Sequence, residues 1–158
     1  MLVSFEEEDT TKTVFVDYRV RSDFLDPVVL TSEFGVTPTR SWAKNEEYIS
    51  KALDPETRKT IQVKRKHPWG IWAVETRGLI SSKKVEQHVL YLLDKLEPRK
   101  ERIKRFLSKK NKYVISFYIR WEPVEIGGGY EVTSQTLRRM TSLCHYIEFN
   151  FENFTNGK

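Results

Sequence analysis

YVISFYIRW, residues 113–121, is the clearest strand in the sequence, because large apolar residues recur at every second position. Such alternation is typical of a β-strand with one buried face and one open face. Residues 14–21, VFVDYRVR, repeat the pattern near the start of the chain. We therefore expect these two strands to form the centre of a sheet, with Ile115, Phe117, Ile119 and Trp121 on its buried face.

Capping residues predict a short helix after each of the two strands. Asp26 is a preferred N-cap and Pro27 suits a first helical position, so residues 28–34 are expected to be helical and to end at Gly35. Thr133 or Ser134 begins a second helix that contains Leu137 and Met140. The two ends of the chain thus resemble each other, which indicates a weak internal β-α-β repeat.

The middle of the chain contains a predicted hairpin and the longest predicted helix. Residues 61–66 and 71–76 alternate on either side of His67-Pro68-Trp69-Gly70, a turn signal, and are expected to pair with each other. Residues 45–57 are polar, with a turn or short helix at Asp54-Pro55. An apolar stripe over residues 85–96 predicts a helix capped by Ser82.

The last predicted strand covers residues 145–151, with Ile147, Phe149 and Phe151 facing inward. These elements together predict an α+β fold, a mixed β-sheet with helices packed mainly on one face. We expect one domain over residues 11–152, with short tails at 1–10 and 153–158.

The composition is typical of a globular protein that remains in the cytoplasm. The chain has 158 residues, 39% of them hydrophobic, and no apolar run approaches the roughly 20 residues of a membrane span. The first nine residues are acidic, unlike a secretory signal. The single cysteine, Cys144, is expected to be a helical core residue spaced with Leu137 and Met140.

The net charge of +5 is concentrated in one segment. Residues 97–112 contain eight basic and two acidic residues, so the rest of the chain sums to −1. The segment 99–112 has two interpretations, an anion-binding face or an ordinary solvated helix surface.

No familiar catalytic or metal pattern occurs in the sequence. His67, His88 and His145 lack metal-ligand spacing, apart from the adjacent Cys144-His145 pair, which has no further ligands. Gly127-Gly128-Gly129 lacks a following Gly-Lys-Ser/Thr, and no Gly-x-Ser-x-Gly elbow is present. We therefore expect no catalytic residue, no metal and no cofactor.

Several motifs follow one another in an order that resembles a known family. FGVTPTRSW at 34–42, WAVET at 72–76 and LLDKLEP at 92–98 are similar to elements of a bacterial family catalogued as a domain of unknown function, number forty-two seventy-nine. The similarity spans roughly 13–151. Asn45 stands where the family tends to have Gly, and Asn tolerates a positive φ. Some members of the family sit beside secreted toxins, so the resemblance implies an immunity protein.

Three functions remain open from the sequence. The leading hypothesis is a protein-binding module that neutralises a cognate protein, in particular a toxin, by contact alone. The second is a nucleic-acid binder that uses either segment 99–112 or an open sheet face, and the third is a small-molecule enzyme with an unrecognised site. Exposed aromatic and basic residues are the candidate partner-binding set: Arg19, Trp42, His67, Trp69, Tyr118 and Arg120.

Overall fold

The computed structural model describes residues 10–124 and 128–151 of the chain. Its main sheet has the strand order β2-β5-β1-β6-β7, and β3 pairs with β4 in a separate two-stranded sheet. The strands are β1 (Thr11–Ser22), β2 (Arg40–Trp42), β3 (Glu47–Leu53), β4 (Thr60–Lys66), β5 (Gly70–Glu75), β6 (Val114–Pro123) and β7 (Tyr146–Phe151). The helices are α2 (Pro27–Phe34), α3 (Val85–Leu96), the 3₁₀ turn η1 (Glu97–Arg99), α4 (Lys100–Leu107) and α5 (Ser134–Thr141).

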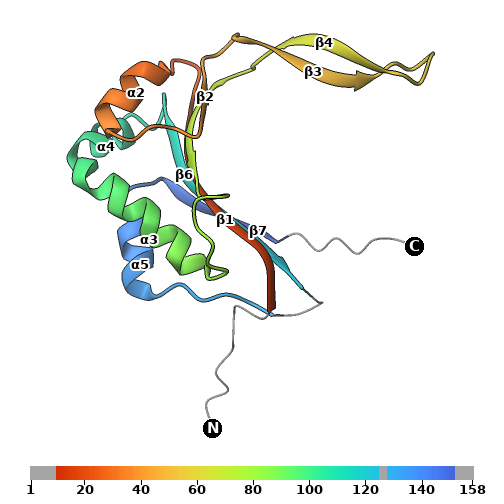
Figure 1. Ribbon diagram of the computed structural model, residues 1–158. Coiled ribbons are helices and arrows are strands. Elements are labelled where there is room, and N and C mark those ends of the chain that lie inside the picture. The colour runs from red at the N-terminus through yellow and green to blue at the C-terminus, as the bar shows by residue number, and fades with distance from the viewer. Residues whose placement is uncertain (1–9, 125–127, 152–158) are drawn as a thin grey trace.

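The helices lie on one face of the main sheet, which confirms the predicted α+β class (Figure 1). β1 and β6 are antiparallel neighbours at its centre. β6, α5 and β7 form a β-α-β unit whose two strands are parallel and adjacent. In the corresponding unit near the N-terminus, β5 lies between β1 and β2. The two units therefore share the order strand, helix, strand, but in the N-terminal unit β5 is inserted between the two strands.

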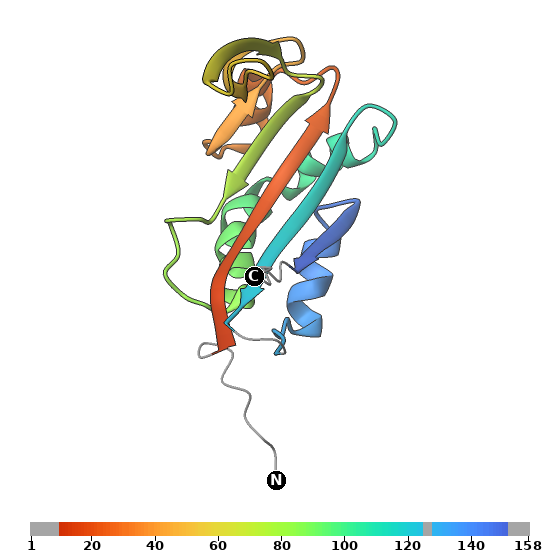
Figure 2. The ribbon, with the colours of Figure 1, turned by 90° about the vertical axis from the view of Figure 1, so that its right-hand side faces the viewer.

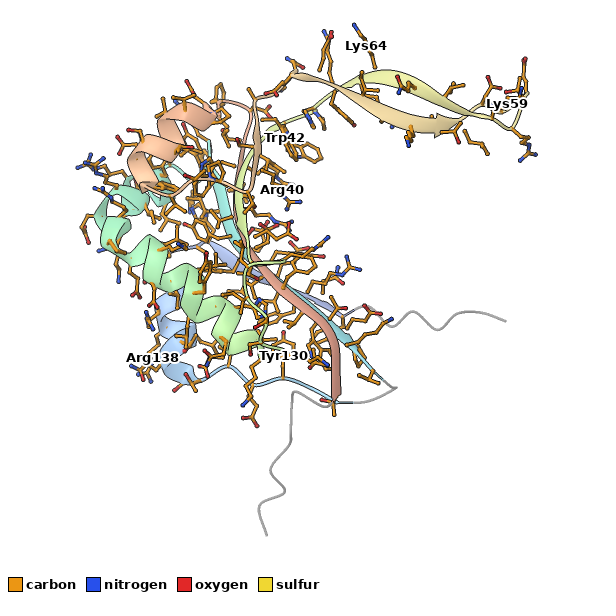
Figure 3. The ribbon with its side chains drawn as sticks, viewed as in Figure 1. Arg40, Trp42, Lys59, Lys64, Tyr130 and Arg138 are labelled. Carbon is orange, nitrogen blue, oxygen red and sulfur yellow. The ribbon has the colours of Figure 1, made fainter. Side chains whose placement is uncertain are left out.

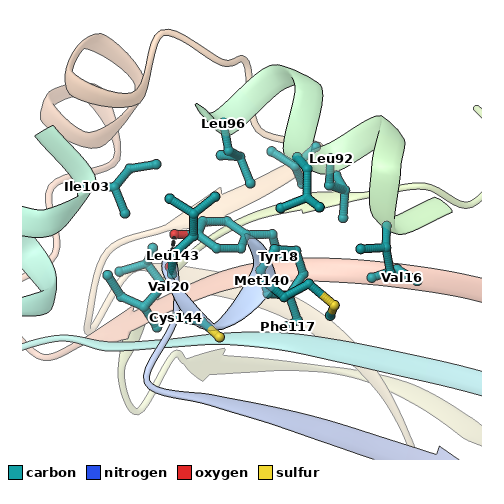
Figure 4. Packing of buried hydrophobic residues seen from close by; sticks show 14 of the residues in the cluster. Val16, Tyr18, Val20, Leu92, Leu96, Ile103, Phe117, Met140, Leu143 and Cys144 are labelled. Carbon is teal, nitrogen blue, oxygen red and sulfur yellow. Dashed lines mark hydrogen bonds between the residues drawn. The ribbon is translucent and has the colours of Figure 1, made fainter. Parts of the chain in front are cut away.

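The core lies between the sheet and α3 (Figure 4). Tyr18 of β1 and Phe117 of β6 are fully buried and meet edge to face, with ring centroids 4.9 Å apart. The Tyr18 hydroxyl donates to the carbonyl of Leu143 at 2.8 Å, so this polar group is satisfied inside the core. The apolar stripe of α3 is buried as expected, at Val85, Val89, Leu92, Leu93 and Leu96.

Three of the four predicted helix ends are confirmed. Asp26 Oδ1 accepts hydrogen bonds from the first turn of α2, and Gly35 ends that helix with φ +63°. Thr133 caps α5. The prediction for Ser82 is wrong, because α3 begins at Val85 after Lys84, which makes no side-chain cap.

The predicted pairing of residues 61–66 with 71–76 is also wrong. β4 pairs with β3, in a segment that was expected to be a polar connection. Backbone hydrogen bonds from His67 N to Glu46 O (3.0 Å) and from Asn45 N to His67 O (2.8 Å) close this hairpin at its base. Asn45 has φ +66°, the left-handed conformation for which Asn is suited.

The end of the chain differs from prediction in two details. Phe149 and Phe151 lie on the helix side of the sheet, as predicted, beside Ile119 and Trp121, but they are 48% and 62% exposed because β7 forms the sheet edge. Cys144 is buried as expected, but it follows α5 instead of lying within it. In the described part of the chain, no helix has the length and apolar character needed to cross a membrane.

Candidate functional site

Within the described residues, one face of the main sheet carries no helix, and we call it the open face (Figure 2). It is built by the residues that alternate with the core positions of each strand. The register places Asp17 of β1 beside Tyr118 of β6 and Glu75 of β5, and Arg19 beside Ser116 and Ala73. The open face is therefore charged and aromatic, in contrast to the apolar face beneath the helices.

A buried carboxylate organises the centre of the open face. Asp17 has no exposed surface, and its Oδ2 accepts from Arg19 Nη2 at 2.8 Å and from Arg40 Nη2. Burial raises the pKa of Asp17, while the positive charges of Arg19 and Arg40 act in the opposite direction. Two guanidinium groups from different strands are thereby held side by side at the surface.

Arginine side chains also cover the aromatic rings of this face. The guanidinium of Arg19 lies 4.1 Å from the ring centroid of Tyr118, and that of Arg77 lies 4.1 Å from the ring centroid of Phe15. Arg120 reaches the same Phe15 ring at 5.7 Å. These cation–π contacts fix the arginines in place and leave little free ring surface.

Trp69 borders two hollows at one end of the open face. A hollow of about 130 Å³ is lined by Arg19, Tyr146 and Glu148 as well as Trp69. A shallower one of about 410 Å³ continues from Trp69 toward Phe24. Trp69 is 41% exposed, and Arg21 lies 5.3 Å from its ring centroid. This tryptophan is thus an exposed aromatic between two concave surfaces.

A stack of three rings joins the open face to the β3–β4 hairpin. His67 lies between Trp42 and Tyr48, with both centroid separations at 4.2 Å and the planes within 20° of parallel. Trp42 belongs to β2 and Tyr48 to β3. The indole Nε1 of Trp42 is buried and has no hydrogen-bond partner within the described residues. The stack therefore fixes the base of the hairpin to the sheet.

The hairpin itself, residues 47–66, projects away from the domain, and we call it the arm (Figure 1). Figure 3 shows Lys64 pointing away from the sheet, whereas Arg40 and Trp42 lie beneath the base of the arm. Residues paired across the strands share a face, so Ile49 and Leu53 lie on the Lys64 side. Ile61 lies on the opposite side.

The arm exposes apolar side chains and carries positive charge. Ile49, Leu53 and Ile61 are 64%, 59% and 41% exposed. The arm contains six basic and three acidic residues, a net charge of +3. At its tip, Asp54 Oδ1 accepts from the backbone N–H groups of Glu56 and Thr57, both at 2.9 Å, and these bonds lower the pKa of Asp54. The tip is therefore a hydrogen-bonded turn.

The structure brings most of the predicted partner-binding residues together. Arg19 contacts Tyr118, and Trp42 stacks on His67. Arg40, which lies on β2 with Trp42, binds the same Asp17 carboxylate as Arg19. Trp69 shares the smaller hollow with Arg19, whereas Arg120 lies further along the sheet, against Phe15.

Sequence reasoning missed the residues that connect this set. Asp17 and Arg40 meet only because β5 lies between β1 and β2, an order that no local pattern shows. Tyr48 belongs to a strand that was not predicted. One sequence pattern could have indicated this face: the charged residues Asp17, Arg19 and Arg21 occupy every second position of β1, so they lie on one side of the sheet.

The other features considered in the sequence lie elsewhere. The basic segment 99–112 forms the end of η1, helix α4 and the following turn, on the helical side of the sheet (Figure 1). His88 bonds Thr76 Oγ1 and Ser82 O, and His145 bonds Ile115 N and Leu107 O, so both rings have structural partners. Over residues 10–124 and 128–151, no three His, Cys, Asp or Glu side chains converge as metal ligands.

Comparison with known proteins identifies the family of this chain. No curated protein and no solved structure matches the sequence. The family described as "Domain of unknown function (DUF4279)" matches residues 11–153, a range that includes every strand and helix from β1 to β7. The chain therefore belongs to the DUF4279 family.

Proposed function

We propose that this chain is a non-catalytic protein-binding module of the immunity type, which neutralises a cognate toxin by direct contact. The observation that carries the proposal is the arm, an ordered hairpin that leaves the domain at an end of the open face. We call the open face and the arm together the inner surface. Neutralisation of this kind needs a complementary surface and no catalytic group.

The physical character of the arm favours a protein partner. A two-stranded hairpin is marginally stable alone in water, and this one buries neither face against the domain. Ile49 and Leu53 project from one face and Ile61 from the other, so contact with a flat surface would cover only one side. Insertion into a cleft covers both, which would remove apolar surface from water on each side.

Charge indicates the chemistry of that cleft. The arm carries +3, and the adjoining open face presents Arg19, Arg21 and Arg40. Since Asp17 holds Arg19 and Arg40 in position, their remaining N–H donors are preorganised for a partner carboxylate. We therefore expect an acidic cleft in the partner, with its carboxylates near the base of the arm.

Nucleic-acid binding is the second candidate, and the turn after α4 is the observation that favours it. Lys109, Lys110 and Lys112 surround a hollow of about 340 Å³ on this turn. The open face is less suited to nucleic acid, because base stacking needs uncovered rings. Arginines already cover Tyr118 and Phe15 at the centre of this face, and the exposed rings, Trp69 and Tyr146, lie only at one end.

The proposal is tested by removing the arm. Replacement of residues 47–66 by Asn-Gly should close a two-residue turn between Glu46 and His67, which are already joined by a backbone hydrogen bond. The candidate partner is the protein encoded beside this gene. In a bacterial growth assay, the native chain should protect cells that express that protein, and the armless variant should not.

A matched control keeps the result specific to the arm. Val28, 78% exposed on α2, is a large apolar residue outside the inner surface, so Val28→Ser should protect like the native chain. The armless variant must also unfold cooperatively. Full protection by a folded armless variant, or no protection and no binding by the native chain, would overturn the proposal.

A salt titration separates the two candidates. Phosphate contacts release counterions, so oligonucleotide affinity falls with a log–log slope near −0.9 per neutralised phosphate. We expect negligible oligonucleotide binding at physiological salt. The protein partner should show a shallower salt dependence than phosphate contacts give, because burial of Ile49, Leu53 and Ile61 contributes beside the charge pairs. Submicromolar oligonucleotide binding that is lost when Lys109, Lys110 and Lys112 are changed to Gln would instead identify this turn as the functional site.

A further inference from the structure

No other described strand pairs with the outer edge of β7, which carries exposed aromatic residues. β7 is the last strand of the main sheet, and it pairs with β6 on one side only (Figure 2). Phe149 and Phe151 stack on Tyr130, with ring centroids 6.3 and 5.9 Å away, yet both remain about half exposed or more. An edge strand presents unpaired backbone groups that can pair with another chain.

β7 lacks the devices that usually block such pairing. Lysine, proline and inward-pointing charge protect most sheet edges. β7 reads YIEFNF and contains none of the first two, and Glu148 is its only charged residue. The opposite edge, β2, is three residues long and includes Arg40. In the arm, β4 contains Lys64, Arg65 and Lys66, and β3 contains Lys51. β7 is thus the least protected edge among the described strands.

We infer that two copies of this chain associate through β7, antiparallel and about a twofold axis at Phe149. The twofold axis is perpendicular to the sheet, so each helix-side residue of one β7 must lie opposite a helix-side residue of the other. Successive residues alternate between the two faces, so this condition holds only when the axis passes beside a single residue that lies opposite its own copy. Centring on Phe149 places it opposite its own copy, with Ile147 opposite Phe151 of the second chain. Aromatic pairs directly opposite each other stabilise adjacent strands.

Charge disfavours one of the two neighbouring registers. With Phe149 at the axis, Glu148 lies opposite Asn150 of the second copy. Centring on Glu148 would instead place two carboxylates directly opposite each other, which is destabilising. Centring on Asn150 would shift Phe149 opposite Phe151 but would also bring the two Asn150 amides together. The Phe149 register therefore avoids the like-charge contact of the Glu148 register and places an aromatic pair on the axis instead of two Asn150 amides.

The association extends the sheet to ten strands, in the order β2-β5-β1-β6-β7 followed by its reverse. Both helical layers lie on the same side, so the two open faces become one surface. The arms, which adjoin β2 at the far edges, remain free. This interface is distinct from the inner surface and does not rest on the proposed function.

The inference is tested by solution mass and by site-directed cross-linking of the full chain. Sedimentation or light scattering at tens to hundreds of micromolar should give twice the mass of one chain. Phe149→Lys places two positive charges at the axis and should give a monomer at the same concentrations. Val28→Lys, which adds the same charge at another exposed apolar position, should leave the dimer intact.

Cysteine cross-linking reports the register. In a Cys144→Ala background, Phe149→Cys should form an intermolecular disulfide under mild oxidation, because directly opposite Cβ atoms lie about 5 Å apart. Phe151→Cys has similar exposure, but its two copies would lie roughly 14 Å apart along the strands, and should not cross-link. A native chain that stays monomeric, or equal cross-linking at both positions, would overturn the inference. Retained cross-linking at 149 supports it even if Phe149→Lys fails to fold.

Discussion

Gly35 offers the most direct test of how the sequence determines the fold. It ends α2 with φ +63°, and its N–H donates to Thr31 O at 2.9 Å. An L-residue in this left-handed conformation costs about 1 kcal/mol relative to glycine. A Cβ at this position would also lie 2.9 Å from Arg99 Nε, closer than van der Waals contact. Moving the Arg99 side chain adds about 1 kcal/mol.

Gly35→Ala should therefore destabilise the protein by about 2 kcal/mol, and Gly35→Val by more, because a β-branched residue fits this conformation poorly. Gly78 is the matched control. It has φ +73°, but a Cβ there would meet nothing within 4 Å. Gly78→Ala should thus cost only the conformational part, about 1 kcal/mol.

The two contributions can be separated by a double-mutant cycle with Arg99→Ala. Removal of the Arg99 side chain should relieve the contact but not the backbone strain, so the cost of Gly35→Ala should fall toward that of Gly78→Ala. The measurement is urea unfolding at constant m-value. If Gly35→Ala and Gly78→Ala lower the free energy of unfolding equally, the proposed contact with Arg99 is refuted. If neither substitution lowers it, the proposed cost of the left-handed backbone is refuted.

The remaining predictions concern buried and titrating groups. Cys144→Ala should keep cooperative unfolding and lose no more than about 2 kcal/mol. Burial raises the pKa of Cys144 to about 11, so a thiol reagent at pH 8 should react with it only as fast as the chain opens. Burial lowers the pKa of His88 below its ordinary 6.5; unfolding therefore takes up a proton, and stability measured by thermal melts should fall as pH drops from 7 to 5. Hydrogen bonds from Thr136 and Thr133 lower the pKa of Glu86, so its contribution is present above pH 4.5 and lost below; Glu86→Gln should flatten that part of the stability profile.

The sequence predicted those elements whose signals are local. Asp26 and Gly35 fix the two ends of α2 through their own backbone and side-chain preferences. Asn45 tolerates the positive φ that its turn requires. The alternation of β1 and β6 is strong because each strand buries one face against α3 and its neighbours.

The arm was missed for the opposite reason. In β3, Tyr48 and Ala52 lie on one face and Ile49 and Leu53 on the other, so the strand has no apolar period of two. That period arises only when one face packs on a core, and the arm has no core. β4 was recognised by its alternation, but its partner was taken to be the next strand. The hydrogen bonds between His67 and residues 45–46 instead join it to β3.

The candidate site could be predicted only in part. Alternation along β1 and β6 places Arg19 and Tyr118, both named as candidate partner-binding residues from the sequence, on the same open face, where they are in contact. The Asp17–Arg40 contact depends on strand order, and the Trp42–His67–Tyr48 stack depends on the arm. Local sequence patterns show neither the order of the strands in the sheet nor the pairing of β3 with β4. The exposure of Phe149 likewise follows from the position of β7 at the edge, which becomes apparent only in the assembled sheet.

The two proposed interfaces lie at opposite edges of the sheet, and this gives a final prediction. The arm adjoins β2, whereas self-association uses β7. In a ten-stranded sheet the outermost strands are nine spacings apart, roughly 40 Å, so each arm can enter a separate partner molecule. Phe149→Lys should therefore leave the affinity of one arm for a soluble partner unchanged within about twofold, and should reduce only apparent affinity for partner at high density on a surface. The armless variant should lose both forms of binding while it still dimerises. Calorimetry in solution and surface binding, performed on both variants, measure these outcomes. A monomeric variant that also loses intrinsic affinity would show that the edge and the arm act as one site.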